Sequence, residues 1–381
     1  MRTLRQHALA RLTPNPPRRL TVALNWLALS PAEVSRGLDG VGGRVATLTA
    51  DDRRTVHVRT VLRAGAGSTV RISLLGEGLT MARVLSGGVT DDDAREVGSG
   101  QRSALGRGAG TDSRTSPSPP RGPLVLVLDD DGGSGERDTF PPPPRVHLLL
   151  AHPRPKVLMR LWSSIAAVGV ASVVVTAAER VERVYWGGGA TRPSRVWSGL
   201  VSGLEQSGDW RVPPVAVTRS KDLSTAARLA IDAATRGPAA AWAGLPAAAE
   251  SDGPGGPRGV AASGGWIVEP GTRTEGSGSG SGSPPILVVG HPRRLDASSG
   301  AAPSVHTVIR RAADGHPAAP VIVAVGPEGG WTEKELSTLS AAGFIAASLG
   351  PRVLATTEAT VSLLALSAAA LEEGTRDEEA Q

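Results

Sequence analysis

The chain of 381 residues contains no cysteine. Without cysteine there is no disulfide framework, no thiolate metal site and no cysteine nucleophile. The seven histidines are scattered rather than grouped, so we expect no metal site. No apolar run approaches the ~20 residues needed to cross a bilayer, so the mature protein is expected to be soluble, with no membrane partner.

Lysine is nearly absent as well, because it occurs only at positions 156, 221 and 334 and arginine supplies almost all the positive charge. Residues 1–20 contain five arginines and no acid, and their charge of +5 equals the whole formal excess of the chain. This composition is typical of an organelle transit peptide, so we expect residues 1–20 to direct the protein to a chloroplast or mitochondrion. The alternative is a basic N-terminus that stays attached to a cytoplasmic protein.

The remaining charge is less informative. Residues 372–381 hold five acids and one arginine and are expected to form an acidic tail. Residues 21–371 then carry about +4, which is only a weak argument for nucleic-acid binding.

Glycine and proline, in contrast, are abundant, with 48 and 30 copies, many of them in runs. Residues 91–121 are mostly Gly, Ser, Arg, Asp and Pro and predict a disordered insertion, because such a composition cannot bury a core. Residues 251–283 predict a second, flexible insertion, broken by one apolar island at 266–268. Four consecutive prolines at 141–144 mark a domain boundary near residue 142.

The first domain, residues 21–142, has the pattern of a small β-barrel. Short apolar or alternating segments at 22–29, 69–75 and 81–89 are separated by glycine turns. Residues 124–128 look like one more strand, displaced by the insertion, whereas 56–63 fit a strand or a helix equally. Many short strands at close spacing indicate a barrel.

The second domain, residues 143–371, opens with a strand at 146–150, a helix from Pro155 to Gly169 and a strand at 171–176. Strand, helix and strand within about thirty residues predict a parallel pair joined by a right-handed crossover, hence an α/β fold. An alanine-rich helical segment follows at 222–250, and a strand at 285–290 ends in Gly290 with His291 behind it.

The most informative stretch begins at Val321. An uncharged β-branched run predicts a buried parallel strand that enters the glycine-rich loop Gly326-Pro-Glu-Gly-Gly330. Thr332 and Glu335 form a capping box for the next helix, and Gly343 is placed to end it in the left-handed region. Ligands of open α/β sheets bind at the carboxyl ends of strands. A glycine-rich loop alone, however, is equally consistent with a tight turn that binds nothing.

A second loop of the same kind follows one strand later. That strand is expected to end in Gly350, and a loop with Arg352 and an apolar helix come next. The pair Gly-Pro-Glu-Gly-Gly-Trp and Leu349-Gly-x-Arg352 resembles the SPOUT class of knotted methyltransferases, and more narrowly the small-subunit ribosomal RNA uridine-N3 methyltransferases. The segments Pro153-Arg-Pro-Lys156, Arg180-Val-Glu-x-x-Tyr-Trp186 and Gly203-Leu-Glu-Gln206 are similar to the same family, as are Asn25, His57, Val61-Leu-Arg63 and Gly67 in the first domain.

The resemblance implies a trefoil-knotted SPOUT domain preceded by a PUA-like β-barrel domain that binds RNA. It also implies S-adenosylmethionine as the cofactor and N3 of a uridine in small-subunit (16S-type) ribosomal RNA as the methyl acceptor. The resemblance further implies a homodimer formed through the knot and the C-terminal helix. The helix expected at 359–371 has no charge, which also suggests a covered face, although a larger monomeric core would cover it equally.

Site residues follow from the same resemblance. The residues expected to bind the cofactor are Val289, Gly290, Val325, Gly326, Pro327, Glu328, Gly329, Gly330, Leu349, Gly350, Val353, Leu354 and Thr356. As catalytic groups we expect Glu328, to take the proton of N3, and Arg352, to stabilise the anion that forms on the flanking carbonyls. Alternatively, Glu328 hydrogen-bonds the amides of its own loop.

RNA contacts are expected from His57, Arg63, Arg154, Lys156 and Arg160. A structural histidine and solvated surface arginines are the alternative reading of these residues. Trp162, Tyr185 and Trp197 could stack on bases, but core packing explains at least two of them better.

One departure weakens the prediction of activity. Where the family reads Leu-Arg-x-Glu-Thr-Ala, this chain has Leu354-Ala-Thr-Thr-Glu-Ala359, so Ala355 replaces an arginine and the Thr357–Glu358 order is exchanged, although Thr356 or Thr357 can still cap the last helix. A catalytically weak RNA-binding or ribosome-assembly factor of the same fold therefore stays open. A Rossmann-type nucleotide enzyme is a third possibility, but it requires the glycine-rich loop after the first strand.

Overall fold

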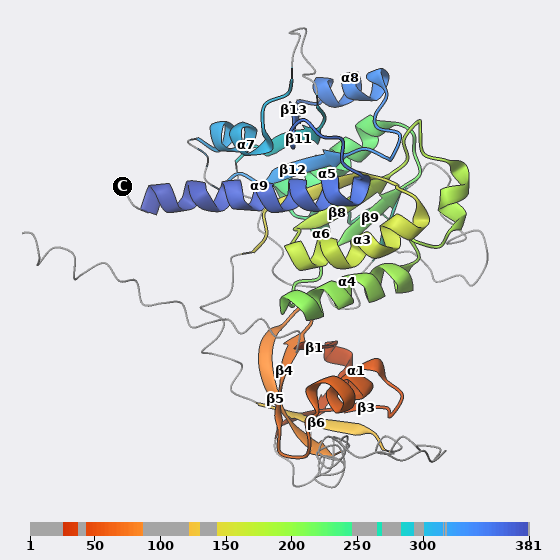
Figure 1. The fold of residues 1–381 in the computed structure, drawn as a ribbon, viewed down its shortest axis with the longest axis vertical. Helices are drawn as coiled ribbons and strands as arrows, with labels where there is room; N and C mark the ends of the chain where they lie inside the picture. Colours follow the sequence, from red (N-terminus) through yellow and green to blue (C-terminus); the bar gives the residue numbers. More distant parts are fainter. Residues whose placement is uncertain are drawn as a thin grey trace, which may run out of the picture.

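A computed structural model describes residues 26–36, 43–86, 122–129, 143–245, 265–268, 283–292, 301–314, 316 and 318–379. The expected transit peptide, Asn25 and the insertion at 91–121 lie outside these ranges. Within them, the chain forms two β-sheets with separate hydrophobic cores (Figure 1). No helix of the described part is long and apolar enough to cross a membrane.

The first sheet has six strands in the order β1-β4-β5-β6-β3-β2. The strands are β1 (Trp26–Leu29), β2 (Val34–Arg36), β3 (Arg44–Leu48), β4 (Thr69–Leu74), β5 (Gly78–Ser86) and β6 (Leu124–Leu128). β6 pairs with β5 on one side and β3 on the other, which confirms that 124–128 is a strand of this domain. Alternate residues of the strands, such as Ile72, Val84 and Leu126, fill one core.

The ambiguous segment 56–63 is helical. After the single-turn η1 (Pro31–Glu33) and β3, α1 (Arg53–His57) continues as the π-helical η2 (Val58–Leu62). Asp52 caps α1 by accepting a hydrogen bond from the backbone N–H of Arg54 at 2.8 Å. Arg63 ends the helix with a left-handed φ of +51°. Val58 faces the core, so the helix covers the sheet.

The second sheet has seven strands in the order β10-β9-β8-β7-β12-β11-β13. These are β7 (Val146–Ala151), β8 (Ser172–Thr176), β9 (Val215–Thr218), β10 (Gly265–Val268), β11 (Ile286–Gly290), β12 (Val321–Val325) and β13 (Ile345–Ala347). All neighbours are parallel except β10, which runs antiparallel to β9. The α/β prediction is confirmed for this domain.

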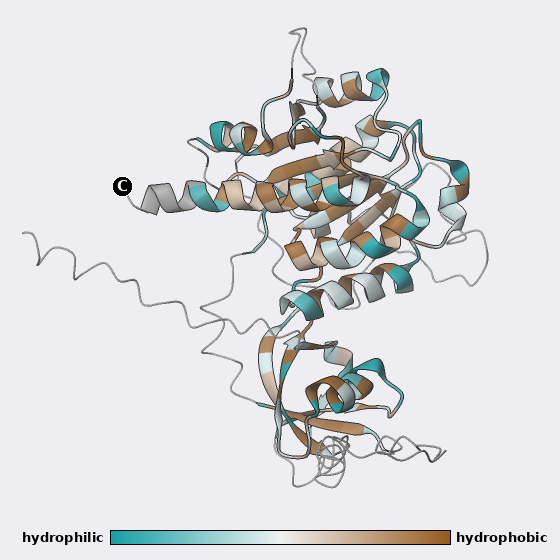
Figure 2. Cartoon of the chain, in the orientation of Figure 1, coloured by the Kyte–Doolittle hydropathy of each residue, from teal (hydrophilic) through white to brown (hydrophobic). Residues whose placement is uncertain are grey.

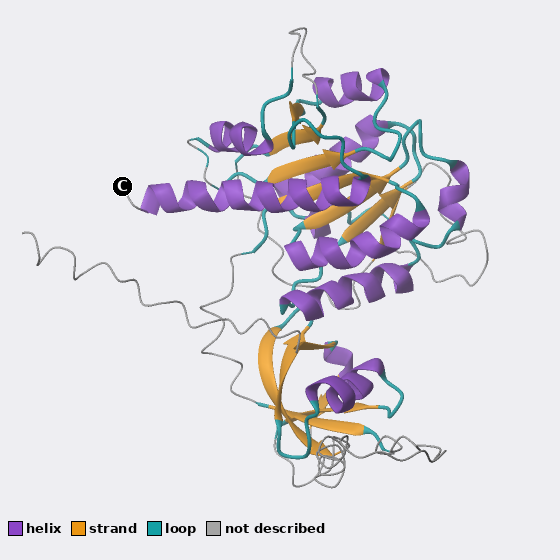
Figure 3. Cartoon of the chain, in the orientation of Figure 1, coloured by secondary structure: helices purple, strands orange, loops and turns teal. Residues whose placement is uncertain are grey.

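Helices cover both faces of this sheet (Figure 3). They are α3 (Pro155–Val168), the 3-10 turn η4 (Arg183–Gly187), α4 (Pro193–Ser207), α5 (Leu223–Arg236), α6 (Pro238–Ala241), α7 (Val305–Ala313), α8 (Glu333–Ala341) and α9 (Thr356–Glu379). Successive residues of one strand point to opposite faces of the sheet and enter different cores. Leu148 packs with α3 and α9, and Leu149 packs with α5 and α8. The strands are therefore mostly apolar, as Figure 2 shows, because both faces are buried.

Three predicted boundaries are wrong. The strand expected to end in Gly350 ends at Ala347, and Leu349 and Gly350 belong to the loop. Within the segment expected to be a flexible linker, Gly265–Val268 forms β10, because its backbone can extend the edge at β9. The last helix begins at Thr356, so Thr356 and Thr357 lie in its first turn rather than at the cap, and it continues through the expected acidic tail to Glu379.

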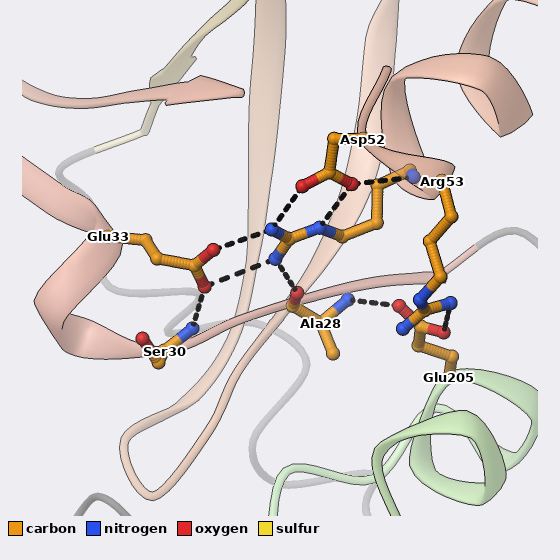
Figure 4. A network of polar contacts seen from close by, with 7 residues as sticks. Ala28, Ser30, Glu33, Asp52, Arg53 and Glu205 are labelled. Carbon is orange, nitrogen blue, oxygen red and sulfur yellow. Dashed lines mark hydrogen bonds and ion pairs between the residues drawn. The ribbon is translucent and has the colours of Figure 1, made fainter. Parts of the chain in front are cut away.

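The two sheets are joined through α4. Glu205 of α4 accepts a hydrogen bond from the backbone N–H of Ala28 in β1 at 3.2 Å and pairs with Arg53 at 2.6 Å (Figure 4). The hydroxyl of Ser73 in β4 donates to the carbonyl of Asp209 at 2.7 Å. Trp26 packs on Gly208, where a Cβ would lie 2.5 Å from the indole nitrogen. Polar and apolar contacts thus fix the first domain on the second.

Candidate functional site

A cleft of about 1660 Å³ opens at the carboxyl ends of β11, β12 and β13. Three loops line it: the loop that starts at Gly290, the glycine-rich loop 326–331, and the loop 347–355 that leads into α9. Because these strands are parallel, their carboxyl ends meet at one edge of the sheet, where open α/β folds bind their ligands.

Most residues expected to bind a cofactor line this cleft. They are Gly290, Val325, Gly326, Pro327, Glu328, Gly330, Leu349, Gly350, Val353, Leu354 and Thr356. Two others do not. Val289 is completely buried in the core beneath the cleft, because its side chain points to the α5 and α8 face of the sheet. Gly329 lies in the same loop but packs against the side chain of Arg180.

The glycine-rich loop closes in a turn in which the N–H of Gly330 donates to the carbonyl of Pro327 at 2.8 Å. Gly330 has a φ of +70°, a backbone conformation that favours glycine. Gly326 lies against the ring of Trp331, and a Cβ on it would approach the indole nitrogen to 3.2 Å. Trp331 is buried and forms one wall of the cleft, so the absence of a side chain at Gly326 lets the ring pack there.

The helix after this loop is anchored by Glu335. The predicted capping box is confirmed: Thr332 and Glu335 exchange side-chain to backbone hydrogen bonds of 3.3 and 2.8 Å. The expected end of the helix is confirmed as well, since Gly343 follows it with a φ of +95°. Glu335 is buried, and its other carboxylate oxygen accepts from the backbone N–H of Glu179 at 2.8 Å. The carboxylate therefore ties the start of α8 to the loop after β8.

Arg180, from the loop after β8, was not predicted as a site residue. Its guanidinium Nη1 donates to the carbonyl of Gly329 at 2.5 Å and to that of Trp331 at 3.4 Å, and the side chain lines the cleft. It lies about 150 residues from the loop that it holds. The only signal in the sequence was its place in the family-like segment Arg180–Trp186.

Glu328 does not bond the amides of its own loop. Its Oε1 accepts from the backbone N–H of Arg154, the residue before α3, at 2.8 Å. That contact bridges the carboxyl ends of β12 and β7. Arg352, the other expected catalytic residue, also lines the cleft and is exposed. The structure thus brings Glu328 and Arg352 to one cleft, from two different loops.

The loop 349–355 is open to solvent. Val353 is 98% exposed and Leu354 39%, although both line the cleft. Gly350 has a φ of +111°, and Ser348 stabilises the turn by accepting from its N–H at 3.0 Å. An apolar loop with this exposure presents surface to a ligand or a partner, because water solvates it poorly.

The expected RNA contacts fall into two groups in separate domains. His57 and Arg63 belong to the helix of the first domain, whereas Arg154, Lys156 and Arg160 are exposed around the start of α3. Of the aromatic residues, Trp162 is in the core, where its indole N–H donates to the carbonyl of Ala190 at 2.9 Å. Tyr185 and Trp197 are half-buried and pack against the cores. Trp162 is therefore not a stacking residue.

The buried His152 lies close to this edge, directly after β7. Its Nδ1–H donates to the carbonyl of Pro153 at 2.6 Å, and burial lowers its pKa. No group of three or more His, Asp or Glu side chains that could hold a metal ion occurs in the described residues.

Part of the chain is similar to known RNA methyltransferases. Residues 293–368 match the family model of the RNA methyltransferase domain. The chain is 31% identical over 75 residues to ribosomal RNA small subunit methyltransferase E of Treponema pallidum, covering 20% of this chain and 28% of that protein. It is 49% identical over 51 residues to the enzyme of the same name from Synechocystis, covering 13% and 17%. The matches thus span less than a third of these relatives.

Among solved structures, ribosomal RNA small subunit methyltransferase E from Neisseria gonorrhoeae bound to S-adenosyl methionine aligns with a TM-score of 0.48 and 17% identity, over 90% of this chain and 96% of that one. The segment that matches the RNA methyltransferase domain, residues 293–368, supplies two of the three loops of the cleft.

Proposed function

We propose that the protein is an S-adenosylmethionine-dependent methyltransferase of ribosomal RNA. The reason is that the segment that matches the RNA methyltransferase domain forms most of the cleft. The observation that carries the proposal is the cleft itself: the glycine-rich loop and the loop 347–355, both within the matched segment, face one cavity. S-adenosylmethionine supplies an activated methyl group, so the protein has to bind it, orient it and exclude water.

The residues present fit this cofactor. Gly330 and Gly350 line the cleft without a side chain, so a ligand can approach the backbone of these loops closely. Val325, Leu349, Val353 and Leu354 supply an apolar wall of the kind that holds an adenine ring. Arg180, which belongs to the loop after β8, holds the glycine-rich loop by its hydrogen bond to the carbonyl of Gly329.

For the acceptor, we propose N3 of a uridine in small-subunit ribosomal RNA. This nitrogen becomes nucleophilic only as its proton leaves. Glu328 can accept that proton through Oε2, which has no hydrogen-bond partner among the described residues, while Oε1 is held by the N–H of Arg154. Arg352 can stabilise the negative charge that develops on the flanking carbonyls.

We also propose the knotted topology and the homodimer. The chain adds β13 at the far edge of the sheet beyond β11 and then returns, so that α9 packs on α7 and α3 and across β12. Such a return crossing is what a trefoil knot requires. On this uncharged helix, Leu363 and Leu364 are 1% exposed and belong to the core, whereas Leu366 is 42% exposed. Leu366, together with the exposed Val353 of the loop before this helix, is therefore an apolar side chain that a second subunit could cover.

Calorimetry with S-adenosylmethionine tests the cofactor site. We compare Gly330→Val with Gly67→Val, because both glycines have a positive φ, +70° and +85°, and a Cβ would meet no close neighbour at either. The two variants therefore carry a similar backbone strain of about 1–3 kcal/mol, but only Gly330 lines the cleft. We expect binding to be lost in Gly330→Val and kept in Gly67→Val. Equal affinities in both folded variants would show that the cofactor binds elsewhere.

Mapping of modified uridines tests the substrate. Cells that lack the protein should lose one N3-methyluridine from small-subunit ribosomal RNA of the chloroplast or mitochondrion. If only cytosolic ribosomal RNA changes, the proposed organelle is wrong, and if no ribosomal RNA changes, the substrate is wrong.

A second candidate function is a ribosome-assembly factor that binds RNA without methylating it. Ala355, which lines the cleft where the family has arginine, favours it. Cofactor binding without methyl transfer to ribosomal RNA would support this alternative.

A further inference from the structure

The carboxyl ends of β7, β8 and β9 form a continuous edge that is rich in exposed positive charge. These three strands are parallel, so the segments that follow them emerge on the same side. The crossover helices α3 and α4 begin there, and neither has an acidic residue in its first turn. We call this surface the basic edge, and its exposed cations are Lys156, Arg160, Arg180, Arg183, Arg195 and Lys221.

Few negative charges offset these cations. Lys156, Arg160, Arg183 and Arg195 form no ion pair with a carboxylate of the described residues. The acidic side chains at this edge are fewer than the six cations: Glu179, Glu182, Asp222 and Glu328. Three of them are fixed by hydrogen bonds: Glu328 accepts from the N–H of Arg154, Glu182 from the hydroxyl of Tyr185 at 3.0 Å, and Asp222 from the N–H of Ser224 at 3.1 Å. Positive ends of the α3 and α4 dipoles add to the field.

The loops that carry the basic edge are packed together rather than independent. Trp186 connects the segments that follow β7 and β9. Its ring lies edge-on to His152, which follows β7, with 4.5 Å between the ring centroids. The guanidinium of Arg219, which follows β9, lies over the same ring at 5.4 Å. Gly188 packs directly on Pro155 at the start of α3, where a Cβ would come within 2.5 Å of the proline ring. A rigid set of cations favours a ligand with regularly spaced anionic groups, because little entropy is lost on binding.

We infer that the basic edge binds the phosphate backbone of the RNA whose base enters the cleft. The inference rests on the proposed function, and Arg180 is the physical link. It belongs to the basic edge, lines the cleft and holds the carbonyls of Gly329 and Trp331. The planar guanidinium of arginine suits phosphate recognition, and the same segment carries the half-buried aromatic residues Tyr185 and Trp186, a residue type that can stack on bases. The backbone is thus positioned next to the loop that carries Glu328.

The test measures binding of a fluorescein-labelled single-stranded RNA by anisotropy across a salt series. The test variant replaces Lys156, Arg160, Arg183 and Arg195 by Ala, none of which lines the cleft. The control replaces Arg236 and Arg311 by Ala, exposed arginines in the last turns of α5 and α7, at the opposite edge of the sheet. We expect the test variant to weaken binding roughly tenfold or more and to reduce the salt slope by about 0.7 per lost contact, roughly 3 in all. The control should match the wild-type protein.

Cofactor binding, measured by calorimetry on the same variants, separates this inference from the proposed function. A test variant that binds S-adenosylmethionine normally but RNA poorly supports the basic edge. A test variant with an unchanged salt slope overturns the basic edge and leaves the methyltransferase proposal intact, and so does a control that loses as much affinity. If the wild-type protein does not bind S-adenosylmethionine, the proposed function is refuted instead. Binding of the wild-type protein to phosphatidylserine vesicles but not to RNA would also overturn the inference.

Discussion

His147 makes the fold sensitive to acid in a range that can be calculated. It lies in β7 between β12 and β8, almost completely buried, and its Nδ1 is 2.7 Å from the hydroxyl of Ser172. Burial disfavours the charged imidazolium and lowers the pKa of His147 to about 4, from the ordinary value of 6.5. The unfolded chain therefore takes up a proton at a pH where the folded protein does not.

The sign follows from proton uptake. Because the folded pKa is depressed, the contribution of His147 is fully present above pH 6.5 and is lost as the pH falls towards 4. A shift of one pKa unit corresponds to about 1.4 kcal/mol, so the free energy of unfolding should fall by about 3 kcal/mol across this window. That is a large share of the roughly 5–15 kcal/mol of a typical domain.

Urea denaturation from about pH 7 to about pH 4 measures the effect, with His147→Gln as the comparison. Glutamine can keep a hydrogen bond to Ser172 but cannot take up a proton. Other acid-sensitive groups, such as His152, whose pKa burial also lowers, and Glu33 and Asp52, whose pKa values are lowered although burial opposes the shift, are common to both proteins and cancel in the difference. The wild-type protein should lose about 3 kcal/mol more than the variant. If the two stabilities fall in parallel, the burial of a neutral His147 is refuted.

Three further predictions concern the contact between the two domains, the contact of Arg180 with the glycine-rich loop, and the proposed contact between subunits. Glu205→Ala leaves the N–H of Ala28 unpaired and should lower the free energy of unfolding by about 1–3 kcal/mol in urea denaturation, whereas Glu77→Ala, which removes an exposed pair with Arg44, should cost at most about 1 kcal/mol. Arg180→Ala frees the carbonyls of Gly329 and Trp331, so amide exchange in the loop 327–331 should accelerate and calorimetry should show roughly tenfold weaker S-adenosylmethionine binding, with Arg180→Lys in between; unchanged exchange would contradict the anchoring role. In sedimentation, Leu366→Asp should give a folded monomer, whereas Leu364→Asp, which buries a charge in the core, should unfold the protein; a wild-type monomer would rule out the dimer.

Local signals along the chain were sufficient for several elements. The capping box of Thr332 and Glu335 and the left-handed Gly343 define α8 because each depends on residues within a few positions of the helix ends. The uncharged run at 321–325 predicts a strand buried on both faces. The strand at 124–128 is identified by its own apolar run of Leu and Val even though an insertion separates it from its partners.

Strand ends and helix faces that depend on a neighbouring strand or helix were not predicted from the sequence. β13 stops at Ala347 because its partner β11 pairs with it only as far as Gly290. β10 forms because β9 offers it an edge, which nothing within 265–268 reveals. On α9, a sequence without charge between 359 and 371 does not distinguish inward from outward residues, so the burial of Leu363 and Leu364 and the exposure of Leu366 could not be predicted.

The α/β order and the two glycine-edged loops follow from short-range patterns in the sequence, and the family resemblance predicted 12 of the 25 residues that line the cleft. Only the tertiary structure decided how these loops are held. Arg180 binds the carbonyl of Gly329, and Glu328 binds the N–H of Arg154, across about 150 and 174 residues of chain. The physical reason is that hydrogen bonds between loops are set by which strand ends become neighbours in the sheet, and strand order is a long-range property that no local pattern encodes.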